Sequence, residues 1–358
     1  MKSRLSPARN QTATNRRETR RRLFLMGLAG SLGCTLDRRP RLNIFNWSAY
    51  VAPTTIPDFE KEFGVQVRYG IYESNEEMLA RVMSGNSGWD VVFPSNYFIR
   101  PMVENGLLAS LRHEWLPNLH HLEPSYRAPS WDPDLRRCVP YMTGASGIAF
   151  SDQLVPSLAA WSDLWSPRLA GRLTMLDDPA EVLGACLKKL GFSINTTSAE
   201  ILERAKREAI AQKRLLRAYL NAEVRDQLVA GDVLAAQLWA TSAQQAIEAS
   251  PRLRFVYPQE GFARYVDNVV VLRESRRHRL AHQFIDYLLR PEVAAATAAA
   301  VWTATPNEGG RELLPDRMRN NPTLYPAPEV LARGEMFEPM PAPAQRLRDR
   351  IWTEIKSA

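Results

Sequence analysis

Aromatic, hydroxyl and acidic side chains recur just beyond short apolar runs of this sequence: Trp47, Tyr50, Ser95, Tyr97, Asp178 and Trp239. Aromatic rings present the negative face of a quadrupole to a cation. Carboxylates accept charge-assisted hydrogen bonds from ammonium groups. Together these residue types predict a site for an organic cation, provided that the fold brings them into one cleft.

Each of these residues also has an ordinary structural interpretation. Asp178-Pro179-Ala180-Glu181 has the pattern of a helix capping box, with Asp at the N-cap and Glu at the third helical position. A tryptophan on an apolar strand, such as Trp239, is more often a core residue than a site residue when taken singly, and Tyr97 and Tyr265 are equally ambiguous. Asp267 is more telling, because an acid next to the apolar run of residues 269–271 needs a partner if it is buried.

The elements that would position these side chains alternate along the chain. Hydrophobic patterns predict strands at residues 42–45, 65–69, 89–93, 146–150, 173–176 and 235–239. Helices are predicted at residues 55–63, from Ser74 onward, and at 179–190, 197–220, 224–230, 279–289 and 291–300. This alternation indicates an α/β protein with a largely parallel sheet. The candidate residues then lie at the carboxyl ends of strands, where such sheets bind ligands.

The charge of the chain is concentrated at its N-terminus. Residues 1–33 carry eight basic side chains against Glu18 alone, so they hold the whole net charge of +7. The rest of the chain therefore has no general attraction for nucleic acid. The apolar stretch at residues 23–33 is too short to span a bilayer as a helix, so we expect residues 1–33 to be an export signal.

Two short motifs refine the expected export signal. Arg21-Arg22-Leu23-Phe24-Leu25 resembles a twin-arginine signal, and Ser31-Leu32-Gly33-Cys34 resembles a lipoprotein cleavage box. Cys34 is then either lipidated, anchoring the protein to a membrane, or unused in an exported soluble protein.

Export implies an oxidising compartment, in which Cys138 and Cys186 could pair, although two buried free thiols are the favoured interpretation. The five histidines show no metal-ligand spacing, so neither a metal nor another cofactor is expected.

Five motifs occur in a fixed order along the chain: residues 46–51 (NWSAYV), 72–76 (YESNE), 92–97 (VFPSNY), 177–182 (DDPAEV) and 305–307 (TPN). With this set, the segment from about residue 42 to about residue 335 resembles the spermidine/putrescine-binding periplasmic proteins. These are the substrate-binding components of ABC-type polyamine importers.

The resemblance implies a two-lobed periplasmic-binding-protein fold of type II. Each lobe is a mostly parallel sheet flanked by helices, and crossover strands join the lobes. The expected segments are the export signal at 1–33, lobe 1 at 41–144 and 267–311, and lobe 2 at 145–266 and 312–358. The implied function is not enzymatic: a periplasmic monomer captures putrescine or spermidine between the lobes and delivers it to membrane permease subunits.

The resemblance also implies a role for each candidate residue. Trp47 and Tyr50 would form aromatic walls, Ser95 and Tyr97 would be contacts of the first lobe, and Trp239 would flank the alkyl chain. Tyr265 replaces a tryptophan and keeps an aromatic face. Asp178 and Glu181 would hold amine nitrogens, and Asp267 would take a terminal amine.

Three positions depart from the pattern of this family. Ala49 stands where spermidine binders carry an acid, Thr303 where a tyrosine is common, and Phe337 near the place of an amide. Trp302 could supply the ring that Thr303 lacks. The remaining carboxylates suit a diamine, or a triamine whose far end meets hydroxyls or water.

Two alternatives remain open. The same fold could bind another organic cation, an amino acid derivative or ferric iron, although no cluster of Tyr and His favours iron. Asp178 and Glu181 could also form a general acid–base pair of an enzyme. They stand three residues apart at one helix start, however, and no nucleophile or metal set accompanies them.

Overall fold

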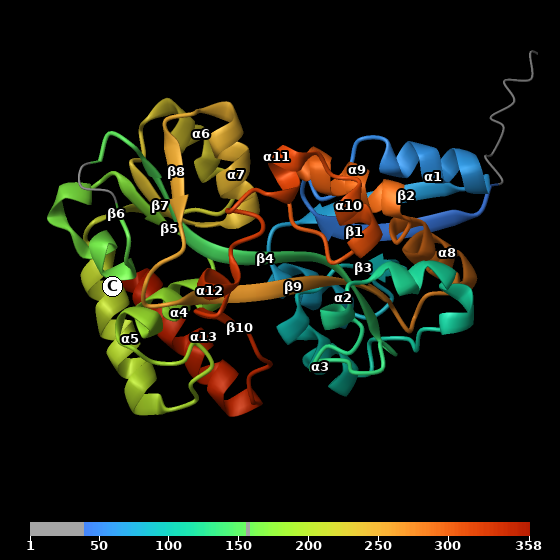
Figure 1. Ribbon diagram of the computed structural model, residues 1–358. Coiled ribbons are helices and arrows are strands. Elements are labelled where there is room, and N and C mark those ends of the chain that lie inside the picture. The colour runs from blue at the N-terminus through green and yellow to red at the C-terminus, as the bar shows by residue number, and fades with distance from the viewer. Residues whose placement is uncertain (1–38, 155–157) are drawn as a thin grey trace, which may run out of the picture. The chain divides into compact units, whose positions relative to one another are not determined.

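The computed structural model describes residues 39–154 and 158–358, which form one compact unit from Arg39 to Ala358 (Figure 1). The expected export signal and Cys34 lie outside the described residues. The expected α/β class is confirmed, because helices flank a single mixed sheet.

The strands pair in the order β2-β1-β3-β9-β4-β7-β5-β6, with β10 added to β9 and β8 added to β4. Their bounds are β1 Arg41–Trp47, β2 Gln66–Tyr72, β3 Val91–Val92, β4 Cys138–Ser151, β5 Leu173–Met175, β6 Leu216–Tyr219, β7 Ala235–Trp239, β8 Leu253–Val256, β9 Phe262–Val271 and β10 Gly334–Met336. Strands β1, β2 and β3 are parallel, and so are β5, β6 and β7. The long strands β4 and β9 run antiparallel to each other between these two regions (Figure 1).

Helices connect the strands of each parallel region, as parallel pairing requires. Their bounds are α1 Thr55–Phe63, α2 Asn75–Met83, α3 Asn96–Glu104, α4 Pro179–Lys189, α5 Ala199–Lys213, α6 Val224–Ala230, α7 Ala240–Ala249, α8 His278–Leu288, α9 Pro291–Val301, α10 Glu308–Glu312, α11 Asp316–Arg319, α12 Pro328–Leu331 and α13 Ala342–Ser357. Short 3₁₀ turns lie at His113–Trp115, Pro117–His121, Pro124–Tyr126, Trp161–Trp165 and Pro167–Leu169.

Helix α2 shows how local sequence sets a boundary near the candidate residues. The Ser74 hydroxyl accepts a hydrogen bond from the Glu77 backbone N–H at 3.1 Å, as the predicted capping box requires. The Glu77 carboxylate, however, accepts from the backbone N–H of Glu73 at 3.0 Å rather than from Ser74. The cap therefore also fixes the residue that precedes the helix.

Separate groups of apolar side chains support the two parallel regions. Ile44 and Phe284 belong to the core around β1 and β3, whereas Leu173 and Ile351 belong to the core around β5. Strand β4 contributes to both, with Val139 in the first core and Ile148 in the second. The predicted lobe boundaries stay a prediction.

Two local predictions are wrong. The helix expected to run from Thr197 to Leu220 is capped by Ser198, ends at Lys213 and is followed by β6, which pairs with β5. Tertiary pairing overrides helical periodicity in this segment. Strand β2 continues to Tyr72, and its residues do not alternate between one buried and one exposed face: Arg68 and Ile71 are exposed, and only Tyr72 is buried.

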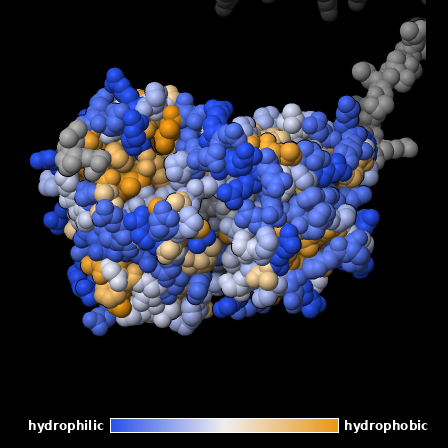
Figure 2. All heavy atoms as spheres, viewed as in Figure 1, coloured by the Kyte–Doolittle hydropathy of each residue, from blue (hydrophilic) through white to orange (hydrophobic). Residues whose placement is uncertain are grey.

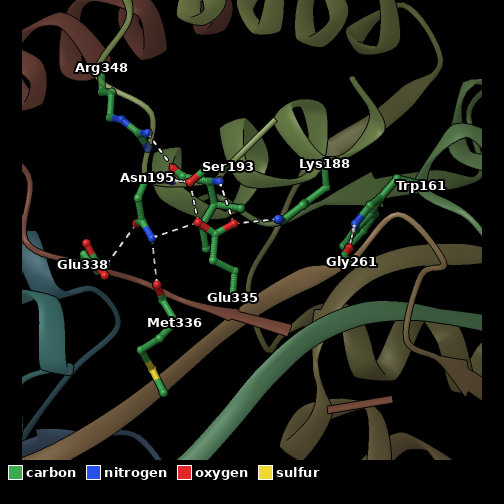
Figure 3. Close-up of polar contacts among 10 residues, drawn as sticks. Trp161, Lys188, Ser193, Asn195, Gly261, Glu335, Met336, Glu338 and Arg348 are labelled. Atoms are coloured by element: carbon green, nitrogen blue, oxygen red, sulfur yellow. Dashed lines mark hydrogen bonds and ion pairs between the residues drawn. The ribbon is translucent and has the colours of Figure 1, made fainter. Parts of the chain in front are cut away.

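The C-terminal segment is fastened to the loop after α4 through the Glu335 carboxylate (Figure 3). Glu335 pairs with Lys188 at 2.5 Å and accepts hydrogen bonds from the Ser193 hydroxyl and from the Asn195 side-chain amide. Arg348 on α13 donates to the Ile194 carbonyl at 2.6 Å. These contacts hold β10 in place beside β9.

The face seen in Figure 2 is mostly hydrophilic, with apolar residues in small scattered groups. Among the described residues, no helix is both long and apolar enough to cross a membrane. Cys138 and Cys186 are buried and unpaired, which agrees with the favoured interpretation of the sequence.

Candidate ligand-binding site

One cavity of about 100 Å³ brings together all nine residues predicted to contact a ligand. We call it the carboxylate slot. Its lining consists of Trp47, Ser48, Ala49, Tyr50, Glu73, Asn75, Ser95, Tyr97, Asp178, Glu181, Ala222, Arg225, Trp239, Thr241, Ser242, Gln245, Tyr265 and Asp267. The structure therefore confirms that these nine residues lie together, while their contact with a ligand stays a prediction.

The slot lies at the carboxyl ends of the parallel strands of both regions. Strand β1 ends at Trp47 and β7 ends at Trp239, while Ser95 and Asp178 stand shortly after β3 and β5. Tyr265 and Asp267 are exceptions, because they lie inside β9 rather than beyond a strand end. Main-chain pairing of Ser95 with Asp267 brings β9 to this edge.

Asp267 is held by two hydroxyl groups. Tyr50 Oη donates to Oδ2 and Ser95 Oγ donates to Oδ1, each at 2.6 Å. Only 4% of Asp267 is exposed, and this burial raises its pKa to about 6, against the opposing effect of the two hydrogen bonds. The partner that the sequence requires for this buried acid is thus a pair of hydroxyls, and no cationic side chain within the described part of the chain pairs with it.

Asn75 organises the neighbouring polar groups. Its side-chain N–H groups donate to Ser95 Oγ at 3.0 Å and to Tyr97 Oη at 3.2 Å. Its Oδ1 accepts from the Ser95 backbone N–H at 3.1 Å. Because Ser95 Oγ is an acceptor from Asn75, its own proton is directed to Asp267.

The capping role and the slot role of Asp178 coexist. Its Oδ1 accepts from the backbone N–H groups of Ala180 and Glu181 at 2.8 Å and 3.0 Å, as the capping box predicts. The same side chain lines the slot, because the N-terminus of α4 faces it. Burial raises the pKa of Asp178.

Glu181 is the least satisfied acid of the slot. It is 2% exposed, and Oε1 accepts from the Trp239 indole N–H at 3.0 Å. Oε2 has no hydrogen-bond partner among the described residues. Burial, followed by the charge of Asp178, raises the pKa of Glu181 to about 8. A buried carboxylate oxygen without a donor is costly, and an ammonium group would supply the missing one.

The aromatic walls are anchored from behind. Trp47 donates from its indole N–H to the Phe93 carbonyl at 2.8 Å, and its ring packs on Tyr72 with centroids 4.7 Å apart. The Tyr141 hydroxyl donates to the Tyr50 carbonyl at 2.7 Å. The Trp47 ring therefore joins a core on one side and lines the slot on the other, whereas the Tyr50 ring packs on Tyr141 with centroids 5.9 Å apart.

Tyr265 reaches the slot across a glycine. A Cβ atom placed on Gly144 of β4 would lie 2.3 Å from the Tyr265 ring. Any larger residue at position 144 would therefore displace the ring. Burial, together with the charge of Asp267, raises the pKa of Tyr265 well above its usual value, so its hydroxyl stays neutral.

The three departures from the family pattern have different outcomes. Ala49 lines the slot with a methyl group and has a left-handed backbone, with φ of 48°. Thr303 is buried and accepts from the Thr241 hydroxyl at 3.0 Å. The idea that Trp302 replaces the absent tyrosine is wrong, because Trp302 lies outside the slot against Arg317. Phe337 also lies outside the lining, packed behind Tyr97.

Several lining residues were not predicted as contacts: Ser48, Ala49, Glu73, Asn75, Ala222, Arg225, Thr241, Ser242 and Gln245. Glu73 and Asn75 directly follow β2, so the strand-end rule would have found them had β2 been predicted at its full length. Arg225 comes from α6, where no sequence signal marks it. It donates to the Ala222 carbonyl at 2.9 Å and to Gln245 Oε1.

The arrangement suits an elongated cation. The slot is lined by four carboxylates and five aromatic rings, but by only one guanidinium group among the described residues. Within residues 39–154 and 158–358, no three His, Cys, Asp or Glu side chains are grouped so that they could hold a metal ion.

Comparisons with known proteins agree with this geometry. Residues 54–322 match the family described as bacterial extracellular solute-binding protein. The chain is 33% identical to the spermidine/putrescine-binding periplasmic protein of Escherichia coli strain K12, over 90% of this chain and 93% of the relative. It is 29% identical to the putrescine-binding periplasmic protein PotF of the same organism, over 92% and 95% of the two chains.

Solved structures give the same picture. A spermidine/putrescine ABC transporter from Listeria monocytogenes is 30% identical, with a TM-score of 0.86, over 88% of this chain and 98% of its own. The TpPotD lipoprotein of Treponema pallidum is 30% identical, with a TM-score of 0.78, over 88% and 99% of the two chains. The expected fold, a two-lobed periplasmic binding protein of type II, is confirmed by these neighbours.

Proposed function

The chain belongs to the family of bacterial extracellular solute-binding proteins, and we propose that it captures polyamines, putrescine or spermidine, for an ABC importer. The bound amine would be delivered to the membrane permease subunits of that importer. Curated relatives named for spermidine and putrescine support this proposal over nearly the whole chain.

The observation that carries the proposal is the state of the buried acids. Asp267 and Glu181 are almost fully buried, share one slot with Trp47, Trp239 and Tyr97, and contact no cationic side chain among the described residues. A ligand with positively charged ends would neutralise these acids, and its alkyl chain would pack between the rings.

The remaining features of the proposal follow from this function. The protein acts as a monomer in the periplasm after export, and Cys34, if lipidated, anchors it to the membrane. It binds no nucleic acid, because its net positive charge lies in residues 1–33 and the rest of the chain has as many acidic as basic side chains. It is not an enzyme: Asp178 and Glu181 occupy one helix start and serve as cap and ligand contact rather than as an acid–base pair.

Calorimetric titration of the purified protein tests the proposed ligand class. Putrescine, spermidine, a neutral amino acid and a sugar are each titrated at neutral pH and low salt. We expect saturable binding of at least one polyamine and none of the amino acid or the sugar. Binding of the amino acid or the sugar alone would overturn the proposal.

A further inference from the structure

The carboxylate slot contains a fourth acid, Glu73, outside the set of residues predicted to bind the ligand. Glu73 directly follows β2, and its backbone N–H donates to Glu77 Oε2 at 3.0 Å. The start of α2, capped by Ser74, therefore fixes the point from which the side chain projects into the slot.

The carboxylate of Glu73 is oriented but has no cationic partner. Ser48 Oγ donates to Oε2 at 3.1 Å. Among the described residues, no lysine or arginine forms a salt bridge with Glu73, in contrast to exposed Glu62, which pairs with Arg290 at 2.7 Å. Glu73 is exposed to solvent, so an approaching ligand can reach its carboxylate.

Glu73 supplies a negative charge beside a part of the slot wall whose own side chains are uncharged. The neighbouring wall is formed by Ser48 and Ala49, a hydroxyl and a methyl group. The other acids come from different elements: Asp267 from β9, and Asp178 and Glu181 from the start of α4. The negative charges of the slot thus project from three separate places on the chain.

The number of these negatively charged positions affects how many ammonium groups of a ligand the slot can pair with. A diamine has two positive ends and can neutralise two of the three places at once, whereas a triamine can neutralise all three. Arg225 lines the slot as its only guanidinium among the described residues, and it donates to the Ala222 carbonyl and to Gln245 rather than to Glu73. The Glu73 side of the slot therefore has an acid free to receive an ammonium group.

We propose that Glu73 is a specificity-determining residue that binds one ammonium group of a three-nitrogen amine, so that the slot prefers spermidine to putrescine. This inference rests on the proposed polyamine function and adds a choice between the two amines. Asp267 and the pair of acids on α4 hold the other two nitrogens, and the Ser48 hydroxyl keeps the Glu73 carboxylate directed toward the ligand.

The test compares both amines on matched variants by calorimetry at low salt. We expect Glu73→Gln to weaken spermidine binding about tenfold, in keeping with the loss of one charge-assisted hydrogen bond, while putrescine affinity changes less than about twofold. Ser48→Ala should weaken spermidine binding by a smaller factor in the same direction. Glu104→Gln removes one exposed acid at the end of α3, outside the slot lining, and should change neither affinity.

Distinct results separate the two proposals. If the unaltered protein binds neither amine, the polyamine function itself fails. If it binds both equally, or if Glu73→Gln weakens both by the same factor or neither, the function stands and the role of Glu73 is overturned. Circular dichroism of the exposed Glu73→Gln variant checks that it is folded, and the Ser48→Ala variant tests the role of Glu73 without altering its charge.

Discussion

Two cavities of this protein share residues but carry opposite charge. The carboxylate slot and a second cavity of about 560 Å³ both include Thr241 and Tyr265 in their linings. We call the second the arginine cavity, because Arg264, Arg311 and Arg319 line it together with one acid, Glu123. It is the larger of the two, so volume alone would select the wrong site for a cation.

The more instructive difference is how the charges are paired. In the arginine cavity, Arg311 pairs with Glu123 at 3.2 Å and stacks on Tyr325, and Arg319 pairs with Asp316. In the slot, Asp267 and Glu181 have hydroxyl and indole donors but no cationic partner among the described residues. The fold thus leaves its unneutralised buried charge where a charged ligand would bind, which agrees with the cost of burying an unpaired ion.

The largest expected effect comes from comparing two substitutions in strand β9, one in each cavity. Asp267→Asn removes a charge from the slot, and Arg264→Gln removes one from the arginine cavity. We expect Asp267→Asn to weaken polyamine binding by about 2–5 kcal/mol, because the ammonium group loses its buried counter-ion. Arg264→Gln should change affinity by less than about 0.5 kcal/mol. Calorimetric titration of both variants measures these changes in affinity. Equal losses of affinity would contradict the assignment of the ligand to the carboxylate slot.

The pH dependence of the slot tests the raised pKa values of its acids. The empty folded protein holds protons on Asp267, with a pKa of about 6, and on Glu181, with a pKa of about 8, more tightly than the unfolded chain does. These groups therefore stabilise the empty protein as the pH falls from about 8 to about 4, and this contribution is lost as the pH rises through the folded-state values.

Amine binding should show the opposite trend. The ligand requires ionised carboxylates, so its affinity should fall as the pH falls from about 8 to about 5, with proton release seen as buffer-dependent binding enthalpy. In Glu181→Gln the upper part of this dependence should flatten, because Gln keeps an acceptor for Trp239 but cannot titrate. Thermal denaturation and calorimetry across this range provide the measurement, and an affinity independent of pH would contradict the assignment.

The smallest expected effect concerns the single guanidinium group of the slot. Arg225→Gln removes a positive charge that opposes a cationic ligand. Since Arg225 is half-buried and solvent screens it, we expect polyamine affinity to rise by only about 0.5–1 kcal/mol at low salt, and less at high salt. A loss of affinity would instead show that Arg225 contributes to the slot through its contacts with Ala222 and Gln245.

Much of the architecture could be predicted because it depends on local signals. Gly64 and Gly231 end α1 and α6 in the left-handed region, as their positions after apolar periodic segments predict. The segment after Lys213 could not be predicted in this way, because its pairing with β5 depends on a strand that lies about forty residues earlier. The same holds for the full length of β2 and therefore for the inclusion of Glu73.

Local sequence patterns specify which chemical groups are present and which strand ends carry them. Trp47, Ser95 and Asp178 follow apolar segments whose period and length are local properties of the chain, so their place at the sheet edge could be read directly. Which of these groups contact one another depends on the three-dimensional fold. Tyr50 and Asp267 are separated by 217 residues along the chain, and long-range strand pairing brings their oxygens together, which no local pattern encodes.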